Sequence, residues 1–389
     1  MRRLFEFLIF SLAAFLIVQA VLMHLGTPGT RSDLDILLLA GQRFSEGHSV
    51  YQLTDFAEHT KPPLLSPLLA LLAHVPIAMV RRFWDLMNLV LPFLVLTLWV
   101  RIWTPGLNPW RDRHFWLKVS LCLILLRGFW RTEMDFGQFN LFLVALQLLA
   151  FRCATNDRLL LAGGISTFCV LLKPSQIFFL PWFINGMPKI TRSRVAFFLT
   201  GSLALILFTT VLYLLYRPAS DLLYAHLDWL SFMKTSTEKH IARLDNFSIP
   251  SLLARQGFAW AASPLVTLAG VGLVLLLSVL RLPHPKAGFQ VIVGLNLSLS
   301  VMTWWQNFVI LIPAAFELLN FRLWRKHPFW AFLGCACLAL PNLVKPAWIG
   351  GPALEQFWKQ TALPLWLANL AIVILLVLSS RPNAPQERG

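Results

Sequence analysis

The chain has 389 residues, of which 57% are hydrophobic and 13% are charged, and its formal net charge is +15. A soluble globular domain has roughly 25% charged and 45–50% apolar residues, so this composition excludes an ordinary soluble fold. The mean hydropathy of +0.66 and the 16 Trp and 31 Phe residues are typical of an integral membrane protein surrounded by lipid. The positive charge therefore indicates basic cytoplasmic loops, and we expect no nucleic-acid partner.

The cysteines show no pattern that predicts a crosslink or a metal site. They lie in or beside apolar stretches, without Cys-x-x-Cys or Cys/His spacing. We expect free, buried thiols, no metal and no cofactor. The five residues are Cys122, Cys153, Cys169, Cys335 and Cys337.

Apolar runs predict an all-α integral membrane protein, a polytopic bundle of about 12 transmembrane helices. A span needs about 20 apolar residues, so several of these runs are short. The first run follows Met1-Arg2-Arg3 but is too long for a signal peptide, which predicts an uncleaved helix with a cytoplasmic N-terminus. The candidate spans are 4–25, 83–102, 115–128, 139–151, 159–172, 175–187, 195–216, 264–280, 288–303, 307–321, 328–343 and 362–379.

Basic residues orient these spans. With alternating spans, the predicted cytoplasmic segments carry 17 Lys and Arg in 54 residues, and the opposite segments carry 15 in 139. The positive-inside rule predicts this bias. It places the large loops 26–82 and 217–263 outside and the polar tail 381–389 in the cytoplasm. Residues 1–380 are expected to form a single unit.

The segment Leu64 to Val80 is an ambiguous case. It is apolar, but it contains Pro67 and Pro76 and ends next to Arg81-Arg82. Counting it as a span would invert every later loop and remove the charge bias. We therefore interpret it as a re-entrant or interfacial helix in the first outer loop.

Polar residues gather at the predicted outer face, where charged or amide groups at membrane depth usually mark a working cavity. Each has a structural alternative: the aspartates as helix caps, the lysine as a snorkelling side chain, the amides as interhelical hydrogen-bonding groups. Their convergence favours a site. The candidates are Asp33, Asp35, Lys61, Arg131, Gln138, Asn140, Lys173, Asn246, Gln306 and Asn307.

Several short motifs in order resemble glycosyltransferase family 87, whose members are polyprenol-phosphate-mannose-dependent mannosyltransferases of the GT-C membrane superfamily. The resemblance runs from about residue 30 to 310. Two motifs depart from the pattern: Lys61 replaces a tyrosine, and the late Trp-x-His-His site has Gln306 and Asn307 in place of both histidines. The matching segments are Asp33 to Ala40, Gly47 to Tyr51, Lys61-Pro62-Pro63-Leu64, Gly137-Gln138-Phe139-Asn140, Ala162-Gly163-Gly164 through Lys173-Pro174, Asn246-Phe247-Ser248 and Trp304 to Asn307.

The resemblance implies a GT-C-type inverting enzyme of the cell membrane, active at its outward or periplasmic face. The donor would be a polyprenyl-phosphate sugar, the sugar a hexose such as mannose, and the acceptor a glycolipid or glycan. The chemistry requires a base for the acceptor hydroxyl and cations for the departing phosphate. Asp33 is the expected base, with Asp35 in reserve, since in a helix Asp35 points about 200° away.

The remaining candidates have binding roles. Lys61, Arg131 and Lys173 are expected to bind the phosphate, and amides such as Gln138, Asn140 and Asn246 the sugar hydroxyls. Asp33-Leu34-Asp35 has the spelling of a metal-binding Asp-x-Asp site, but the resemblance aligns Asp33 with the base.

Two other functions remain open. A lipid-linked saccharide transporter or flippase would need polar groups through the membrane centre. A polymerase or ligase would depend more on Arg243 and His240 in the later loop.

Overall fold

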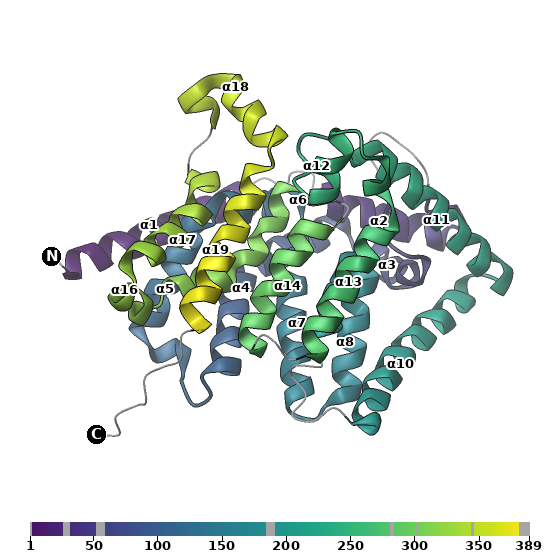
Figure 1. Ribbon diagram of the computed structural model, residues 1–389. Coiled ribbons are helices and arrows are strands. Elements are labelled where there is room, and N and C mark those ends of the chain that lie inside the picture. Colours follow the sequence, from purple (N-terminus) through teal and green to yellow (C-terminus); the bar gives the residue numbers. More distant parts are fainter. Residues whose placement is uncertain are drawn as a thin grey trace.

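The computed structural model describes residues 2–25, 32–51, 59–183, 191–280, 284–300, 302–343 and 346–380. The described residues form helices and connecting turns and contain no strand (Figure 1), which confirms the all-α prediction. The predicted tail 381–389 and parts of the first outer loop lie outside this description.

The first half of the chain supplies α1 to α8, with three short 3-10 helices labelled η. The elements are α1 (Arg2–Leu25), α2 (Ser32–Ser45), η1 (Pro63–Leu65), α3 (Ser66–Ala73), α4 (Ile77–Trp103), η2 (Pro109–Arg111), α5 (Arg113–Leu125), α6 (Arg127–Phe136), α7 (Asn140–Thr155), α8 (Leu159–Leu172) and η3 (Pro174–Phe179).

The second half supplies α10 to α19. The elements are α10 (Arg192–Tyr216), α11 (Ala219–His240), α12 (Ile249–Arg255), η4 (Ala259–Ala262), α13 (Pro264–Val279), α14 (Pro285–Leu299), η5 (Trp305–Leu311), α15 (Ile312–Leu318), α16 (Phe321–Lys326), α17 (Pro328–Leu343), α18 (Pro346–Gln360) and α19 (Leu363–Ser380).

The predicted number of spans is not established by the helix lengths. Among the described residues, α1, α4 and α10 are long and apolar enough to cross a membrane, and the number reaches five if two bent pairs each count as one span. The pairs are α6 with α7, bent by 102°, and α18 with α19, bent by 59°. Most other predicted spans coincide with shorter helices, such as α5, α8 and α17. The predicted span 175–187 begins in η3, and its last four residues lie outside the described ranges.

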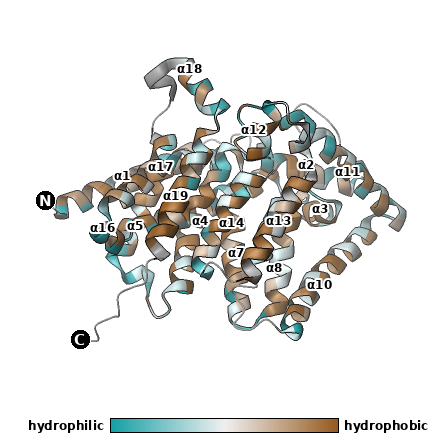
Figure 2. Cartoon of the chain, in the orientation of Figure 1, coloured by the Kyte–Doolittle hydropathy of each residue, from teal (hydrophilic) through white to brown (hydrophobic). Residues whose placement is uncertain are grey.

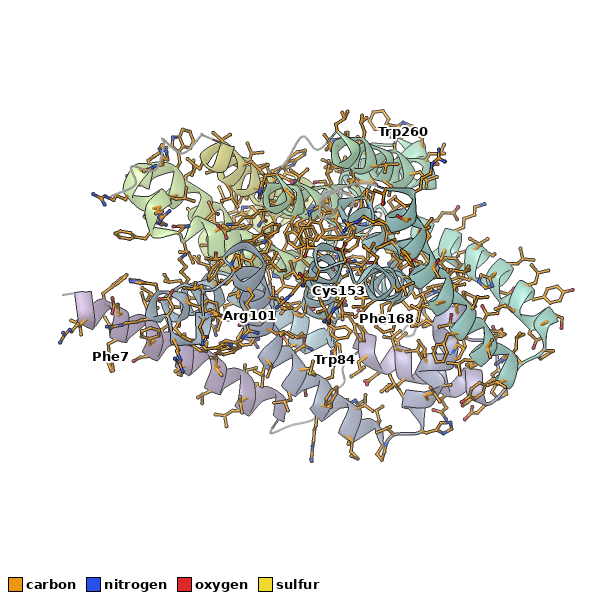
Figure 3. All side chains as sticks on the ribbon, turned by 90° about the horizontal axis from the view of Figure 1, so that it is seen from below. Phe7, Trp84, Arg101, Cys153, Phe168 and Trp260 are labelled. Carbon is orange, nitrogen blue, oxygen red and sulfur yellow. The ribbon has the colours of Figure 1, made fainter. Side chains whose placement is uncertain are left out.

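The lipid-facing surface is apolar. Only 17% of the most apolar stretch of α10 is buried within the protein, and its residues Leu199, Leu203 and Leu207 are exposed. Figure 2 shows hydrophobic colour along the outer sides of α10, α13 and α19. In Figure 3 Phe7 and Trp260 point away from the packed interior, whereas Cys153 lies within it. Contact between water and this much apolar surface would be unfavourable, so we infer that lipid covers these outer faces.

The ambiguous segment Leu64 to Val80 covers parts of three elements, and it begins with the last two residues of η1. Its middle part is α3, of 8 residues, which at 1.5 Å per residue spans about 12 Å and cannot cross the bilayer. Its last residues form the first turn of α4, which starts at Ile77 rather than at the predicted 83. α3 packs closely on α2, where a Cβ on Gly41 would clash with the carbonyl of Leu69.

The pairing of α8 with α10 depends on two glycines. A Cβ on Gly163 would clash with the carbonyl of Phe198, and a Cβ on Gly201 with the carbonyl of Leu160. Small residues allow such close backbone approach between helices in lipid. The Ala162-Gly163-Gly164 motif thus has a packing role, and it positions α8, whose end carries Lys173.

We expect Gly163→Ala to destabilise the protein by about 1–3 kcal/mol, the usual cost of overpacking. Thermal unfolding in lipid nanodiscs measures this effect. The matched control is Gly272→Ala in α13, where a Cβ would have no neighbour within 4 Å. That control should be neutral or slightly stabilising, because alanine favours helix. Equal melting temperatures for the two variants would contradict the close α8–α10 contact.

Candidate active site

A sharp bend between α6 and α7 begins the site. Gly137 ends α6 in the left-handed conformation, with φ of 64°, which glycine adopts without strain. Gln138 follows in the irregular link, and Asn140 is the first residue of α7. Irregular backbone inside a membrane protein is tolerated where protein buries it or where it lines a cavity.

Four buried or half-buried side chains form a continuous chain at this bend. Asn140 Nδ2 donates to Glu133 Oε2 at 2.7 Å, and Lys173 Nζ donates to Asn140 Oδ1 at 2.6 Å. Lys173 Nζ also donates to Asn307 Oδ1 at 3.2 Å. The second carboxylate oxygen of Glu133 accepts from the Leu141 N–H at 3.1 Å. The carboxylate, two amides and ammonium satisfy one another, as buried polar groups must.

Helix breaks bring these groups together from distant parts of the chain. Lys173 is the C-terminal residue flanking α8, and Pro174 starts η3 directly after it. Asn307 lies in η5, which packs on α6 through Phe129: its ring lies 5.0 Å from that of Trp305 and 5.3 Å from that of Phe308. Proline and these aromatic contacts fix where each polar group enters the cluster.

Asp33 joins the same bend from α2. It lies in the first turn of α2, and its Oδ2 accepts a hydrogen bond from Gln138 Nε2. Its charge also acts on the ammonium groups of Lys61 and Lys173. Burial lowers the pKa of Lys61, and the nearby Asp33 carboxylate opposes that shift. Asp33, Lys61, Glu133 and Lys173 therefore bring two carboxyl groups and two amino groups to the same bend.

Asp35 points elsewhere, as its helical spacing predicts. Both of its oxygens accept from Arg81, at 2.8 Å from Nε and 2.7 Å from Nη2. This bidentate pair joins α2 to the first turns of α4 and neutralises the Asp35 carboxylate. The structure thus favours Asp33 over Asp35 as the carboxylate of the site.

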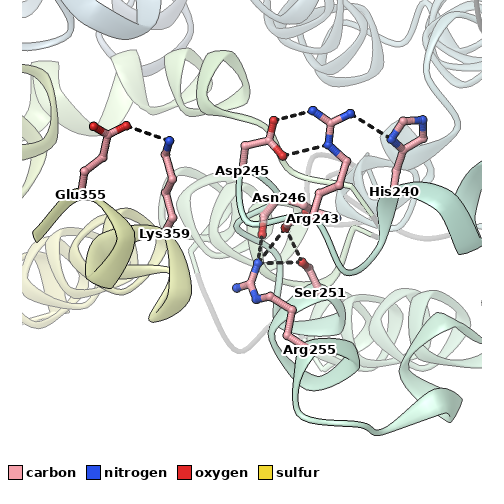
Figure 4. Close-up of polar contacts among 8 residues, drawn as sticks. All are labelled: His240, Arg243, Asp245, Asn246, Ser251, Arg255, Glu355 and Lys359. Atoms are coloured by element: carbon pink, nitrogen blue, oxygen red, sulfur yellow. Dashed lines mark hydrogen bonds and ion pairs between the residues drawn. The ribbon is translucent and has the colours of Figure 1, made fainter. Parts of the chain in front are cut away.

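Asn246 holds the backbone that leads into η5 of the site. It is fully buried, and its Oδ1 accepts from the Thr303 N–H at 2.9 Å, which fixes the chain just before Trp304. Ser248 of the same motif caps α12 through the Ser251 N–H. Figure 4 shows the surrounding network, in which Arg255 donates to the carbonyl of Asn246 at 3.0 Å.

Two other predicted residues lie apart from the hydrogen-bonded chain. Arg131 is half-exposed and pairs with Asp135 at 3.6 Å along α6. Gln306 is buried beside Asn307 in η5. The sequence interpretation had missed Glu133 and Arg81. Glu133 was detectable as an acidic residue between the candidates Arg131 and Gln138, whereas the partner of Arg81 becomes evident only in three dimensions.

The described residues offer few side chains that could bind a metal ion together. Within the described ranges no group of three or more His, Cys, Asp and Glu side chains is arranged to hold a metal ion.

Comparison with known families identifies the chain. The model of glycosyltransferase family 87 matches residues 59–303, more than half of the sequence. The chain belongs to glycosyltransferase family 87. It is therefore a glycosyltransferase, and its apolar helices place it in a membrane. No curated protein matches the chain.

The extent of the family match affects how the site is assigned. The matched residues include Lys61, Gln138, Asn140, Lys173 and Asn246, but they begin after Asp33 and end before Asn307. The family membership is thus confirmed over the central part of the site. Asp33 and Asn307 are joined to that part by their contacts with Gln138 and Lys173.

Proposed function

We propose that this family 87 protein transfers a hexose, in our proposal mannose, from a polyprenyl-phosphate donor to a glycolipid or glycan acceptor at the non-cytoplasmic face. One observation carries the proposal: a carboxylate, Asp33, and a cation, Lys173, meet at one junction of broken helices. The two groups correspond to the two demands of the reaction, a base and a phosphate ligand.

The proposed reaction is a single displacement. The acceptor hydroxyl oxygen attacks C1 of the donor sugar, the bond from C1 to the phosphate oxygen breaks, and its electron pair leaves with the polyprenyl phosphate. The hydroxyl proton goes to Asp33. One displacement inverts the configuration at C1, so the enzyme is an inverting transferase in this proposal. Gln138 holds the Asp33 carboxylate in place through its amide hydrogen bond.

Lys173 is suited to bind the leaving phosphate. Two of its three N–H donors are directed to the amide oxygens of Asn140 and Asn307, and the third has no hydrogen-bond partner among the described residues. Charge-assisted hydrogen bonds to phosphate strengthen where water is excluded. Lys61, whose charge interacts with Asp33, is the second proposed phosphate ligand.

The replacement of the family's two histidines is compatible with this scheme. Gln306 and Asn307 cannot carry a proton at neutral pH, so neither serves as an acid or base. Asn307 instead orients Lys173 by accepting its N–H. The proton transfer in our scheme rests on Asp33 alone.

Arg243 and His240 are the residues on which the alternative function, a polymerase or ligase, would depend. They lie beside the site rather than in the polar junction. The Arg243 guanidinium makes a bidentate pair with Asp245 and lies 5.3 Å from the centre of the Trp304 ring. The Asp245 pair uses the Nε and Nη2 donors, and Nη1 lies 3.4 Å from His240 Nδ1, so the guanidinium is engaged outside the junction. The base-and-phosphate junction therefore supports direct transfer better.

The orientation of the site follows from charge and helix direction. The N-terminus of α7 and the C-terminus of α8 carry site residues. Their other ends meet where Arg152 lies in the last turn of α7 and Arg158 directly precedes α8. Basic turns favour the cytoplasm. We therefore propose that the site opens to the opposite face.

Cysteine labelling of intact cells tests this orientation. An impermeant maleimide should label Glu46→Cys and Lys234→Cys, both at exposed positions, but not Arg325→Cys in α16 until the cells are opened. Background should be low because the five native cysteines are buried. Labelling of Arg325→Cys alone in intact cells would invert the proposed topology.

Purified protein tests the reaction directly. With a glycolipid acceptor, label should pass from polyprenyl-phosphate-mannose to the acceptor, and guanosine-diphosphate-mannose should give none. Transfer from the nucleotide sugar alone would refute the proposed donor class.

A further inference from the structure

A cavity lies next to the junction of Asp33, Lys61 and Lys173, and the proposed reaction steps do not use it. Its volume is about 160 Å³, and it opens between the end of α2, η1 and the start of α11. The chain has only 4 Tyr residues, and three of them, Tyr51, Tyr213 and Tyr224, line this cavity. In a chain with 31 Phe, such a concentration of hydroxyl-bearing rings indicates a polar ligand.

Two carboxylates complete the wall from α11. Asp221 and Asp228 line the cavity with Tyr224, and their spacing of three and seven positions puts them on one helix face. Burial raises the pKa of Tyr51, and the Tyr213 and Asp228 charges act in the same direction. The Tyr51 hydroxyl thus stays protonated and lies near the Asp228 carboxylate.

Ser66 supplies an independent sign that a ligand belongs here. Its side chain lines the cavity and is 1% exposed. Its buried Oγ has no hydrogen-bond partner, and Ser66 lies within the described residues. Leaving a buried hydroxyl unpaired costs about 1–3 kcal/mol. A bound polar molecule would satisfy it.

The charges of the cavity select against a phosphate. Arg217 also lines it, but its guanidinium donates to the carbonyls of Arg43, Phe44 and His48 at the end of α2. Its Nε and Nη2 donors are thereby directed to the backbone. Against this one guanidinium the wall has two carboxylates, Asp221 and Asp228, so its net charge is negative and repels anions, and the carboxylates accept hydrogen bonds from neutral hydroxyls.

The cavity adjoins the catalytic junction through the chain that bears Lys61. Tyr51 Oη donates to the Lys61 carbonyl at 2.8 Å, and Pro63, directly after Lys61-Pro62, is part of the wall. A ligand in the cavity is therefore adjacent to the segment whose ammonium interacts with Asp33.

We propose that this cavity binds an uncharged sugar ring of the acceptor. The inference rests on the proposed glycosyl transfer and names the acceptor class as a neutral glycan or glycolipid. Tyrosine faces pack against the C–H face of the ring, and Ser66, Asp221 and Asp228 bind its hydroxyls. The volume is below the roughly 300–1,000 Å³ of drug-sized sites, which fits a single ring rather than a whole lipid.

Two variants test the cavity without touching the junction. Ser66→Ala should raise the acceptor KM about three- to ten-fold, and Asp228→Asn about ten-fold or more, with donor KM unchanged. Ser66→Ala should leave the melting temperature equal or higher, because it removes an unpaired buried hydroxyl. The control is Glu355→Gln, a half-exposed carboxylate of α18 paired with Lys359.

Direct binding separates this inference from the proposed function. Saturation-transfer NMR with methyl α-mannoside and methyl β-glucoside in nanodiscs, free of glycoside detergents, should show weak binding that Ser66→Ala and Asp228→Asn reduce. Inorganic phosphate should not compete. Glycoside binding to wild-type protein that fails to transfer sugar would support the cavity and refute the transferase proposal. Unchanged glycoside signals in both variants, or no signal in the wild type, would overturn the cavity assignment.

Discussion

Asp33→Asn is expected to reduce turnover by about 10²-fold or more, the usual scale for losing general-base assistance. The substitution keeps the shape of the side chain and an oxygen that can accept from Gln138, but it removes the basicity. Folding should change little, because an amide can still act at a helix N-terminus. Turnover and melting temperature, measured on the same preparation, provide the test.

The competing explanation is that Asp33 only stabilises the start of α2. Both aspartates lie in its first turn, where carboxylates interact favourably with the helix dipole. That explanation predicts near-normal turnover for Asp33→Asn and lost stability for Asp33→Ala. Asp35→Asn is the matched control in the same turn: it breaks the Arg81 pair and should lower stability more than turnover.

Lys173→Ala should weaken use of the lipid-phosphate donor by about 10- to 100-fold, since charged hydrogen bonds contribute about 1.5–3 kcal/mol. The loss should appear in the donor KM, or in both constants if the bond strengthens in the transition state. Steady-state kinetics with varied donor measures it. The control is Lys359→Ala, which removes a lysine of α18 that pairs with Glu355. This variant should behave as wild type.

Removing Lys173 also leaves Glu133 buried without its linked cation, which destabilises proteins strongly. The double variant Glu133→Gln with Lys173→Gln removes both charges and should recover much of the melting temperature while donor use stays poor. Normal donor kinetics in a folded Lys173→Ala variant would support the snorkelling alternative instead.

Composition was sufficient to predict the all-helical membrane class, whereas the outward orientation inferred from the charge bias stays a prediction. Twenty-residue apolar runs and basic turns follow from the bilayer as solvent, so they are local signals. The helix breaks were less predictable. The connection between the predicted spans 115–128 and 139–151 contains α6, because the aromatic side of α6 packs on η5, a contact between residues far apart in sequence.

The site was predictable by residue type but not by partner. Asp33, Gln138, Asn140, Lys173 and Asn307 are brought together as expected from their polarity at membrane depth. Their network depends on Glu133, whose role requires the bend at Gly137 to be known. Asp35 resembled Asp33 in the sequence, and only the position of Arg81 distinguishes the two.

The most direct test of the central claim is to measure both reaction products, the released polyprenyl phosphate and the mannosylated acceptor, in one experiment. Wild-type protein in nanodiscs, given polyprenyl-phosphate-mannose and a glycolipid acceptor, should release one polyprenyl phosphate for each mannose transferred, and Asp33→Asn should lower both products together. Equal product formation by wild type and Asp33→Asn, or phosphate release without any transfer, would contradict the account.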